Sequence, residues 1–194
     1  MDTSAITVAK RKDRDRLVDT MVLAFARDPV MRWGQPEPHR YLTFFRSFTK
    51  VSCGRAFEHD SAHHIPDFSG AAVWLPPGIE LDAEAVVGVL EKTLEANRLK
   101  VAFAMLEQMG RYHPTEPHWY LWMIGVDPAK QGRGYGKALL RYALDRIDRE
   151  GAPAYLENSN PANTGLYEQH GFEVIGTIQV DDAPPVLPML RRSR

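Results

Sequence analysis

The sequence predicts an α/β fold in which helices flank a central β-sheet. From residue 118 onward, apolar segments typical of strands alternate with amphipathic segments typical of helices. A glycine-rich loop joins the first of these strands to the helix that follows it. Strand–helix–strand order brings the strands into one sheet with the helices packed against it, so these two observations predict the fold class.

The C-terminal half carries the most regular pattern of elements. We expect a strand over His118–Val126, a helix over Gly132–Arg149, a strand over Ala154–Asn158, a helix over Pro161–His170, and strands over Phe172–Val180 and Val186–Leu190. The second helix has its own boundary signals: Asn160 suits the N-cap, Pro161 the first helical position and Gly171 the C-cap.

The N-terminal half is less regular. We expect a strand over Ala5–Lys10, helices over Asp13–Ala26 and Pro38–Val51, strands over Arg55–Glu58 and Gly70–Leu75 joined by His59–Ser69, and a long helical region over Asp82–Met109, broken near Asn97. Asp28-Pro29 ends the first helix, because the residue before a proline is pushed out of the α region.

Length and composition indicate a soluble globular protein. The 194 residues suit a single domain over 1–194, with 44% hydrophobic and 25% charged residues. The 24 basic and 25 acidic side chains almost cancel, which favours neither nucleic acid nor an anionic membrane as a partner. No apolar stretch approaches the length of a membrane helix.

Cysteine content bears on the compartment. Cys53 is the only cysteine, so the chain cannot form an internal disulfide, which suits a reducing compartment. Its neighbours match no catalytic cysteine signature, and we expect a buried or incidental thiol. Because Met1–Lys10 also lacks an apolar run, we expect a cytoplasmic protein.

The glycine-rich loop is the most informative segment. Gly132, Gly134 and Gly136 follow the strand that ends at Val126 and open the next helix. Glycines allow a sharp turn and a close approach of the backbone, and a helix N-terminus suits a phosphate or pyrophosphate. The spacing fits neither the Rossmann fingerprint, whose last glycine is here Lys137, nor the P-loop.

The strand, the Gln-x-x-Gly-x-Gly loop and the helix together resemble the pyrophosphate loop of GNAT-type N-acetyltransferases. About thirty residues later, Asn163, Tyr167 and the Gly171-Phe172 pair resemble the second cofactor-binding motif of that family. The resemblance covers roughly residues 119–172. The residues of these two motifs are similar to those of the branch that contains puromycin N-acetyltransferase.

This resemblance implies a mixed, splayed central sheet flanked by helices, with acetyl-CoA as co-substrate and no metal. It also implies a small-molecule amine as acceptor and a monomer or homodimer. The residues implied to hold the cofactor are Ile124, Gly125, Val126, Gln131, Gly132, Arg133, Gly134, Tyr135, Gly136, Lys137 and Asn163.

The resemblance implies one catalytic residue, and the position of a carboxylate on a covered strand suggests a second. Tyr167 would lie near the thioester sulfur, where a phenol of pKa about 10 can donate to a departing thiolate of pKa about 8.5. A backbone N–H of the strand ending at Val126 would meet the oxyanion. No carboxylate lies on that strand, so Glu157 is the first candidate for the general base, and His118 and Glu116 are weaker candidates.

Several aromatic residues could line the acceptor pocket, although each also suits a hydrophobic core: Trp33, Phe44, Phe45, Trp119 and Trp122. Residues 59–67 contain three histidines and two aspartates, but we interpret the segment as a solvated connection and not as a metal site. Two alternative functions stay open. One is a non-catalytic acyl-CoA-binding sensor or scaffold, and the other is an acyltransferase acting on a protein N-terminus.

Overall fold

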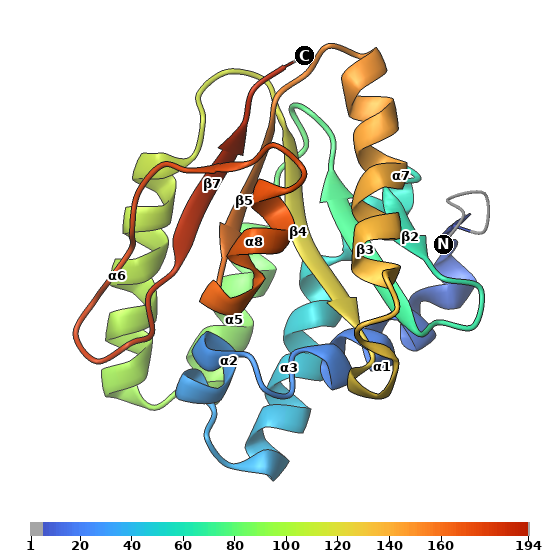
Figure 1. Ribbon diagram of the computed structural model, residues 1–194. Coiled ribbons are helices and arrows are strands. Elements are labelled where there is room, and N and C mark those ends of the chain that lie inside the picture. Colours follow the sequence, from blue (N-terminus) through green and yellow to red (C-terminus); the bar gives the residue numbers. More distant parts are fainter. Residues whose placement is uncertain (1–5, 194) are drawn as a thin grey trace.

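The computed structural model describes residues 6–193, and within them one sheet of seven strands has the order β1-β2-β3-β4-β5-β7-β6 (Figure 1). The strands are β1 (Thr7–Val8), β2 (Ala62–His64), β3 (Gly70–Leu75), β4 (Trp119–Val126), β5 (Ala154–Asn158), β6 (Glu173–Val174) and β7 (Leu187–Arg191). β4 and β5 run parallel, and the other neighbouring pairs of this sheet are antiparallel. The predicted α/β fold with a mixed sheet is confirmed.

Helices cover both faces of this sheet. They are α1 (Arg14–Ala24), α2 (Pro29–Gly34), α3 (Pro38–Ser52), α4 (Gly54–Glu58), α5 (Ala83–Thr93), α6 (Ala96–Tyr112), α7 (Tyr135–Arg149) and α8 (Thr164–Glu168). In Figure 1, α7 and α8 lie on the face of the sheet turned to the viewer, whereas α3 and α5 lie behind it.

Alternation along the strands separates two hydrophobic cores. On β3, Ala71, Val73 and Leu75 join the core under α1 and α3, whereas Ala72 and Trp74 join the core under α7. Successive strand residues point to opposite faces, so this fully buried strand serves both cores.

The centre of the sheet opens where β4 and β5 meet. The two strands pair only at Trp119↔Ala154, Tyr120↔Tyr155 and Leu121↔Leu156, although both continue beyond these residues. On the other side of β4 the register against β3 shifts at Trp122, which forms a β-bulge. The strands therefore diverge as in a splayed sheet, and β4 continues toward α1 while β5 turns toward α8 (Figure 1).

Two predictions near residue 58 are wrong. The segment Arg55–Glu58, predicted as a strand, belongs to helix α4, in which Ala56 and Phe57 are buried. The predicted connection His59–Ser69 contains strand β2, which pairs with both β1 and β3. Three residues are too few to show alternation in the sequence, and β2 is buried along its whole length.

Two further differences concern ends of elements. The predicted helix Pro161–His170 is a 3-10 turn over Pro161–Asn163 followed by α8. Of the predicted strand Phe172–Val180 only β6 forms, with an isolated bridge at Ile178. Ala5, in the predicted first strand, lies outside the described residues.

Cys53 has a buried thiol, as its sequence context predicted. Burial raises the pKa of the Cys53 thiol to about 12. Across residues 6–193, no group of three or more His, Cys, Asp or Glu side chains could hold a metal ion. Over the same residues, no helix is long and apolar enough to cross a membrane.

His63 is buried between the sheet and α7. Its ring packs edge-on against Tyr142, with ring centroids 4.8 Å apart. Burial, assisted by the nearby charge of Arg146, lowers the pKa of His63 to about 4. Between pH 6.5 and 4 the unfolded chain therefore binds a proton at His63 that the folded chain does not, so acidification destabilises the fold.

We predict that His63→Phe reduces the acid sensitivity of stability. From pH 7 to pH 5 the buried histidine accounts for a loss of about 2 kcal/mol in the free energy of unfolding, and phenylalanine cannot titrate. Urea unfolding at both pH values measures the difference. His59→Phe, at an exposed histidine, is the control and should keep the dependence of the parent chain. An equal pH dependence in His63→Phe and the parent would contradict the prediction.

Candidate active site

A cleft of about 720 Å³ lies where β4 ends and α7 begins. Its walls come from the end of β4, the glycine loop, the first turn of α7 and the segment from Asn160 to Tyr167. The cleft reaches the opening between β4 and β5, because Ile124 and Tyr167 line both the cleft and a smaller cavity in that opening.

The glycine loop has the geometry of an anion-binding turn. Gly132 and Gly134 have φ angles of +76° and +81°, a conformation that residues with a Cβ rarely adopt. Gly134 is also the N-cap of α7 and has no side chain to cap the first amides of that helix. Those N–H groups and the side chains of Arg27 and Lys137 are thus available at the cleft for a negatively charged group.

Every residue predicted to hold the cofactor lines this cleft except Arg133. Arg133 belongs to the loop, but it is exposed and does not belong to the cleft lining. Gln131 closes the loop on itself, because its side-chain amide donates to the carbonyl oxygen of Val126 at 3.2 Å. Asp127 supports the same turn by accepting from the amide of Ala129 at 2.9 Å.

Tyr167 lies at the inner end of the cleft. Its side chain is buried, with 6% of the residue exposed, and its ring packs against Phe172. Burial, with the negative charge of Asp28 nearby, raises the pKa of its hydroxyl, so Tyr167 keeps its proton at neutral pH. Asn160 caps the segment that leads to it by accepting from the amide of Ala162 at 3.1 Å.

Asp28 is a site residue that the sequence analysis interpreted only as the end of a helix. It caps α2 by accepting from the amide of Met31 at 3.0 Å, and Ser159 donates its hydroxyl to the other oxygen at 2.6 Å. Burial raises the pKa of this carboxyl against the effect of these hydrogen bonds. An Asp before Pro is also an N-cap signature, and this signal could have revealed α2.

A small cavity of about 50 Å³ fills the opening between β4 and β5. Tyr167 and Asp28 border it from the side of the cleft, and both also line that cleft. Glu157 borders it on β5 and also lines two larger cavities on the face of the sheet covered by α3 and α5. The opening is therefore the passage between the two faces.

Glu157 is a buried carboxylate held by a tyrosine. Its side chain is 5% exposed, and Tyr120 of β4 donates its hydroxyl to Oε2 at 2.5 Å. Burial, and then the carboxylate of Glu157, raise the pKa of Tyr120 well above its usual value, so the tyrosine stays a donor. The other oxygen of Glu157 lies 3.7 Å from Nδ1 of His113.

Two histidines connect Glu157 with the protein surface. Nδ1 of His118 lies 2.8 Å from the carbonyl oxygen of Glu116, which only accepts, so Nδ1 carries a proton. Burial lowers the pKa of His118, and its ring is neutral at neutral pH with an accepting Nε2. Nε2 of His113, 3.0 Å away, then donates to it. The other ring nitrogen of His113, Nδ1, faces Glu157.

The cavity behind Glu157 is lined mainly by apolar side chains and has a volume of about 150 Å³. Trp33, Phe44, Phe45 and Trp122, which were candidates for an acceptor pocket, line it. Trp119 was also a candidate, but it lies in the core on the opposite face, where its indole donates to Glu150 at 2.8 Å. Trp119 and Trp122 lie three residues apart on β4, so strand alternation alone places them on opposite faces of the sheet.

Residues 56–172 match the Acetyltransferase (GNAT) family. This chain belongs to that family. An uncharacterized N-acetyltransferase of Schizosaccharomyces pombe is 28% identical over 181 residues, which are 83% of this chain and 71% of that protein. The N-alpha-acetyltransferase RimI of Mycobacterium tuberculosis is 42% identical over 78 residues, which are 39% of this chain and 47% of RimI.

The fold agrees with this assignment. The crystal structure of a histone acetyltransferase HPA2 and related acetyltransferase from Corynebacterium glutamicum superimposes with a TM-score of 0.70 at 25% identity, covering 98% of this chain and 96% of that one. Like other GNAT members, this chain is an acetyltransferase, and the family uses acetyl-CoA as co-substrate and amines as acceptors. The narrower resemblance to the puromycin N-acetyltransferase branch stays a prediction.

We predict that Gly134→Ala weakens coenzyme A binding more than it weakens the fold. A Cβ at positive φ costs about 1 kcal/mol, and relief of that strain moves the α7 amides away from the cleft. Loss of one hydrogen bond to a charged phosphate corresponds to about a 10-fold higher Kd, which titration calorimetry measures.

Gly151 provides the matched control. It lies beyond the other end of α7 with φ +61°, and a Cβ there meets no neighbouring atom within 4 Å, as at Gly134. Gly151→Ala should therefore show a similar stability loss with unchanged coenzyme A affinity. Equal affinities of both variants for coenzyme A would contradict the role of the loop.

Proposed function

We propose that this chain transfers the acetyl group of acetyl-CoA to the primary amine of a small molecule, by direct attack in a ternary complex. The observation that carries the proposal is the continuous path from the cleft at α7, through the opening between β4 and β5, to the cavity behind Glu157. Acetyl-CoA would supply an activated acetyl thioester in the cleft, and the amine would enter from the opposite face.

In this proposal the glycine loop and Asn163 hold the cofactor. The first amides of α7, with Arg27 and Lys137, face the pyrophosphate, whose charge suits the positive end of a helix dipole. The backbone of β4 past Leu121 no longer pairs with β5, which leaves N–H groups on that edge for the cofactor and for the oxyanion.

Glu157 acts as the general base. An ammonium with a pKa near that of lysine, about 10.4, must lose a proton before it attacks. The carboxylate borders the opening, and Tyr120 donates to its Oε2, whereas its Oε1 faces His113. Glu157 passes the proton to Nδ1 of His113, and His113 passes the proton of its Nε2 to His118, which releases it to solvent.

Tyr167 acts at the leaving group. The amine nitrogen forms a C–N bond to the acetyl carbon, and the C–S bond breaks with its electron pair on sulfur. Tyr167 donates its proton to that sulfur and recovers the second proton lost by the nitrogen. The products are the acetamide, coenzyme A as thiol and one net proton.

We predict that Tyr167→Phe lowers kcat about 100-fold without changing coenzyme A affinity. Acetyl-CoA turnover, followed as free thiol with a mixed panel of small amines, measures kcat. Tyr142→Phe, on α7 and outside the cleft lining, removes a hydroxyl elsewhere and should keep the parent rate. Unchanged turnover in Tyr167→Phe would remove the tyrosine from the mechanism. If the parent chain binds coenzyme A but turns over no amine or peptide, a non-catalytic sensor is favoured.

We predict that His113→Ala lowers kcat about 10-fold or more and that imidazole in the buffer restores it. His113 is half-buried at the wide cavity of about 640 Å³, through which imidazole can enter. Glu157→Gln should lose activity without such rescue, because its carboxyl is the group that takes the proton. The exposed His39→Ala should behave as the parent. A loss at His113 that imidazole leaves unchanged would contradict proton transfer through this ring.

The likeness to RimI supports a second candidate, acetylation of a protein N-terminus. The matched part covers 39% of this chain, so the likeness leaves most of the acceptor side uncompared. Peptides with a free N-terminal amine therefore belong in the turnover panel, and a preference for them over every small amine would replace the small-molecule proposal.

A further inference from the structure

The cavity behind Glu157 differs in character from the rest of the site. Its walls include Phe44, Phe48, Val86, Leu90 and Met105, from three helices. Apart from Glu157 and Ser159, the lining side chains are apolar or aromatic. An apolar cavity of about 150 Å³ is large enough for one benzene-sized group and tends to stay dry.

We propose that the acceptor is a hydrophobic primary monoamine whose aromatic or compact alkyl body occupies this cavity. This inference rests on the proposed function and names the substrate class of the same site. With the body among these side chains, the ammonium lies at Glu157, the carboxylate nearest the opening between β4 and β5. The amine nitrogen then faces the passage that leads to Tyr167.

Charge around the entrance agrees with a cationic ligand. The wider cavity of about 640 Å³ adjoins the apolar one and shares Tyr120, Trp122 and Glu157 with it. Glu80 and Glu116 lie at this entrance, and among its described lining residues there is no lysine or arginine. Negative side chains at the entrance attract an ammonium, which Glu157 can pair with once the amine is inside.

The same cavity disfavours more polar acceptors. A polyamine whose chain enters this cavity would bring a second ammonium among Phe44, Phe48 and Leu90, where no lining side chain could pair with it. An unpaired buried charge is strongly unfavourable. A peptide would bury several amide groups, for which the lining offers few partners beyond the indole N–H groups of Trp33 and Trp122.

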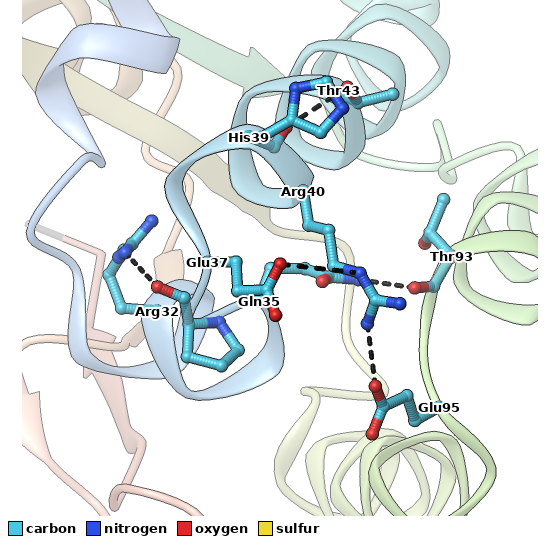
Figure 2. A network of polar contacts seen from close by, with 9 residues as sticks. Arg32, Gln35, Glu37, His39, Arg40, Thr43, Thr93 and Glu95 are labelled. Carbon is cyan, nitrogen blue, oxygen red and sulfur yellow. Dashed lines mark hydrogen bonds and ion pairs between the residues drawn. The ribbon is translucent and has the colours of Figure 1, made fainter.

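A polar network lies next to Leu94, one of the residues that line the cavity (Figure 2). Gln35, which is buried, donates from its side chain to the carbonyl oxygen of Thr93 at 2.5 Å, and Arg40 pairs with Glu95 at 2.7 Å. These contacts join Gln35, after α2, and Arg40, in the first turn of α3, to the end of α5 and the connection to α6. Leu94, in that connection, lines the cavity, so the network limits how far a ligand can extend.

The experiment compares acceptors of matched reactivity in the full chain. We expect phenethylamine to have a KM about 10- to 100-fold below that of ethylamine, because burial of a phenyl group is favourable. We also expect phenethylamine to have a higher kcat/KM than spermidine or a peptide with a free N-terminus. Equal KM values for the two small amines, or a preference for spermidine or the peptide, would overturn the inference while leaving acetyl transfer intact.

A variant on α6 tests the cavity directly. Ala102 lines the cavity, and Ala102→Phe fills it, so the KM for phenethylamine should rise about 10-fold while kcat and the KM for ethylamine stay near the parent values. Ala104→Phe makes the same change on the same helix, outside the lining of the described cavities, and should leave both KM values unchanged. Thermal unfolding confirms that both variants fold.

Absence of turnover with every acceptor would contradict the proposed function and not the ligand class. In that case binding of the amine is tested directly. We measure how much phenethylamine increases Tm in the presence of coenzyme A. An increase that exceeds the effect of ethylamine and disappears in Ala102→Phe supports the inference. Equal effects of the two amines, or an effect that persists in Ala102→Phe, would overturn it.

Discussion

The parallel pair β4–β5 forms hydrogen bonds over three residue pairs and then separates, and the rest of the site depends on this separation. Elsewhere in the sheet, paired strands and two hydrophobic cores divide the molecule into two faces. The opening after Leu121 and Leu156 connects those faces. A cleft beside α7 and a cavity beside α3 and α5 therefore both reach the small cavity in this opening, and Phe25, at the end of α1, lines all three.

The opening places polar side chains in the protein interior. Hydrogen bonds to these side chains stabilise the structure around the opening. Asp28 and Glu157 border the opening from different elements, and each accepts hydrogen bonds from a defined donor, Ser159 for the first and Tyr120 for the second. A buried carboxylate without such donors would be costly. The bond between Asp28 and Ser159 also joins the start of α2 to the end of β5, which keeps the mouth of the opening at a defined width.

Prediction from sequence succeeded for elements whose own residues show a complete helix or strand pattern. The helix after the glycine loop has an apolar stripe at Leu139, Leu144 and Ile147, and β5 was predicted with the bounds that the structure has. It was wrong at Arg55–Glu58, because five residues supply less than two helical turns of pattern. It also missed β2, whose three residues are all buried.

The sequence by itself determined the family and the fold class, because the glycine loop and the Asn163–Tyr167 segment, the two motifs proposed to hold the cofactor, are continuous stretches whose spacing has local physical meaning. Only the tertiary structure shows which residues surround the opening between β4 and β5. Asp28, His113 and Tyr120 come from separate parts of the chain, and they meet Ser159 and Glu157 because β4 and β5 first pair and then diverge. Contacts between residues so far apart in sequence depend on strand register and helix packing, and no local pattern encodes either.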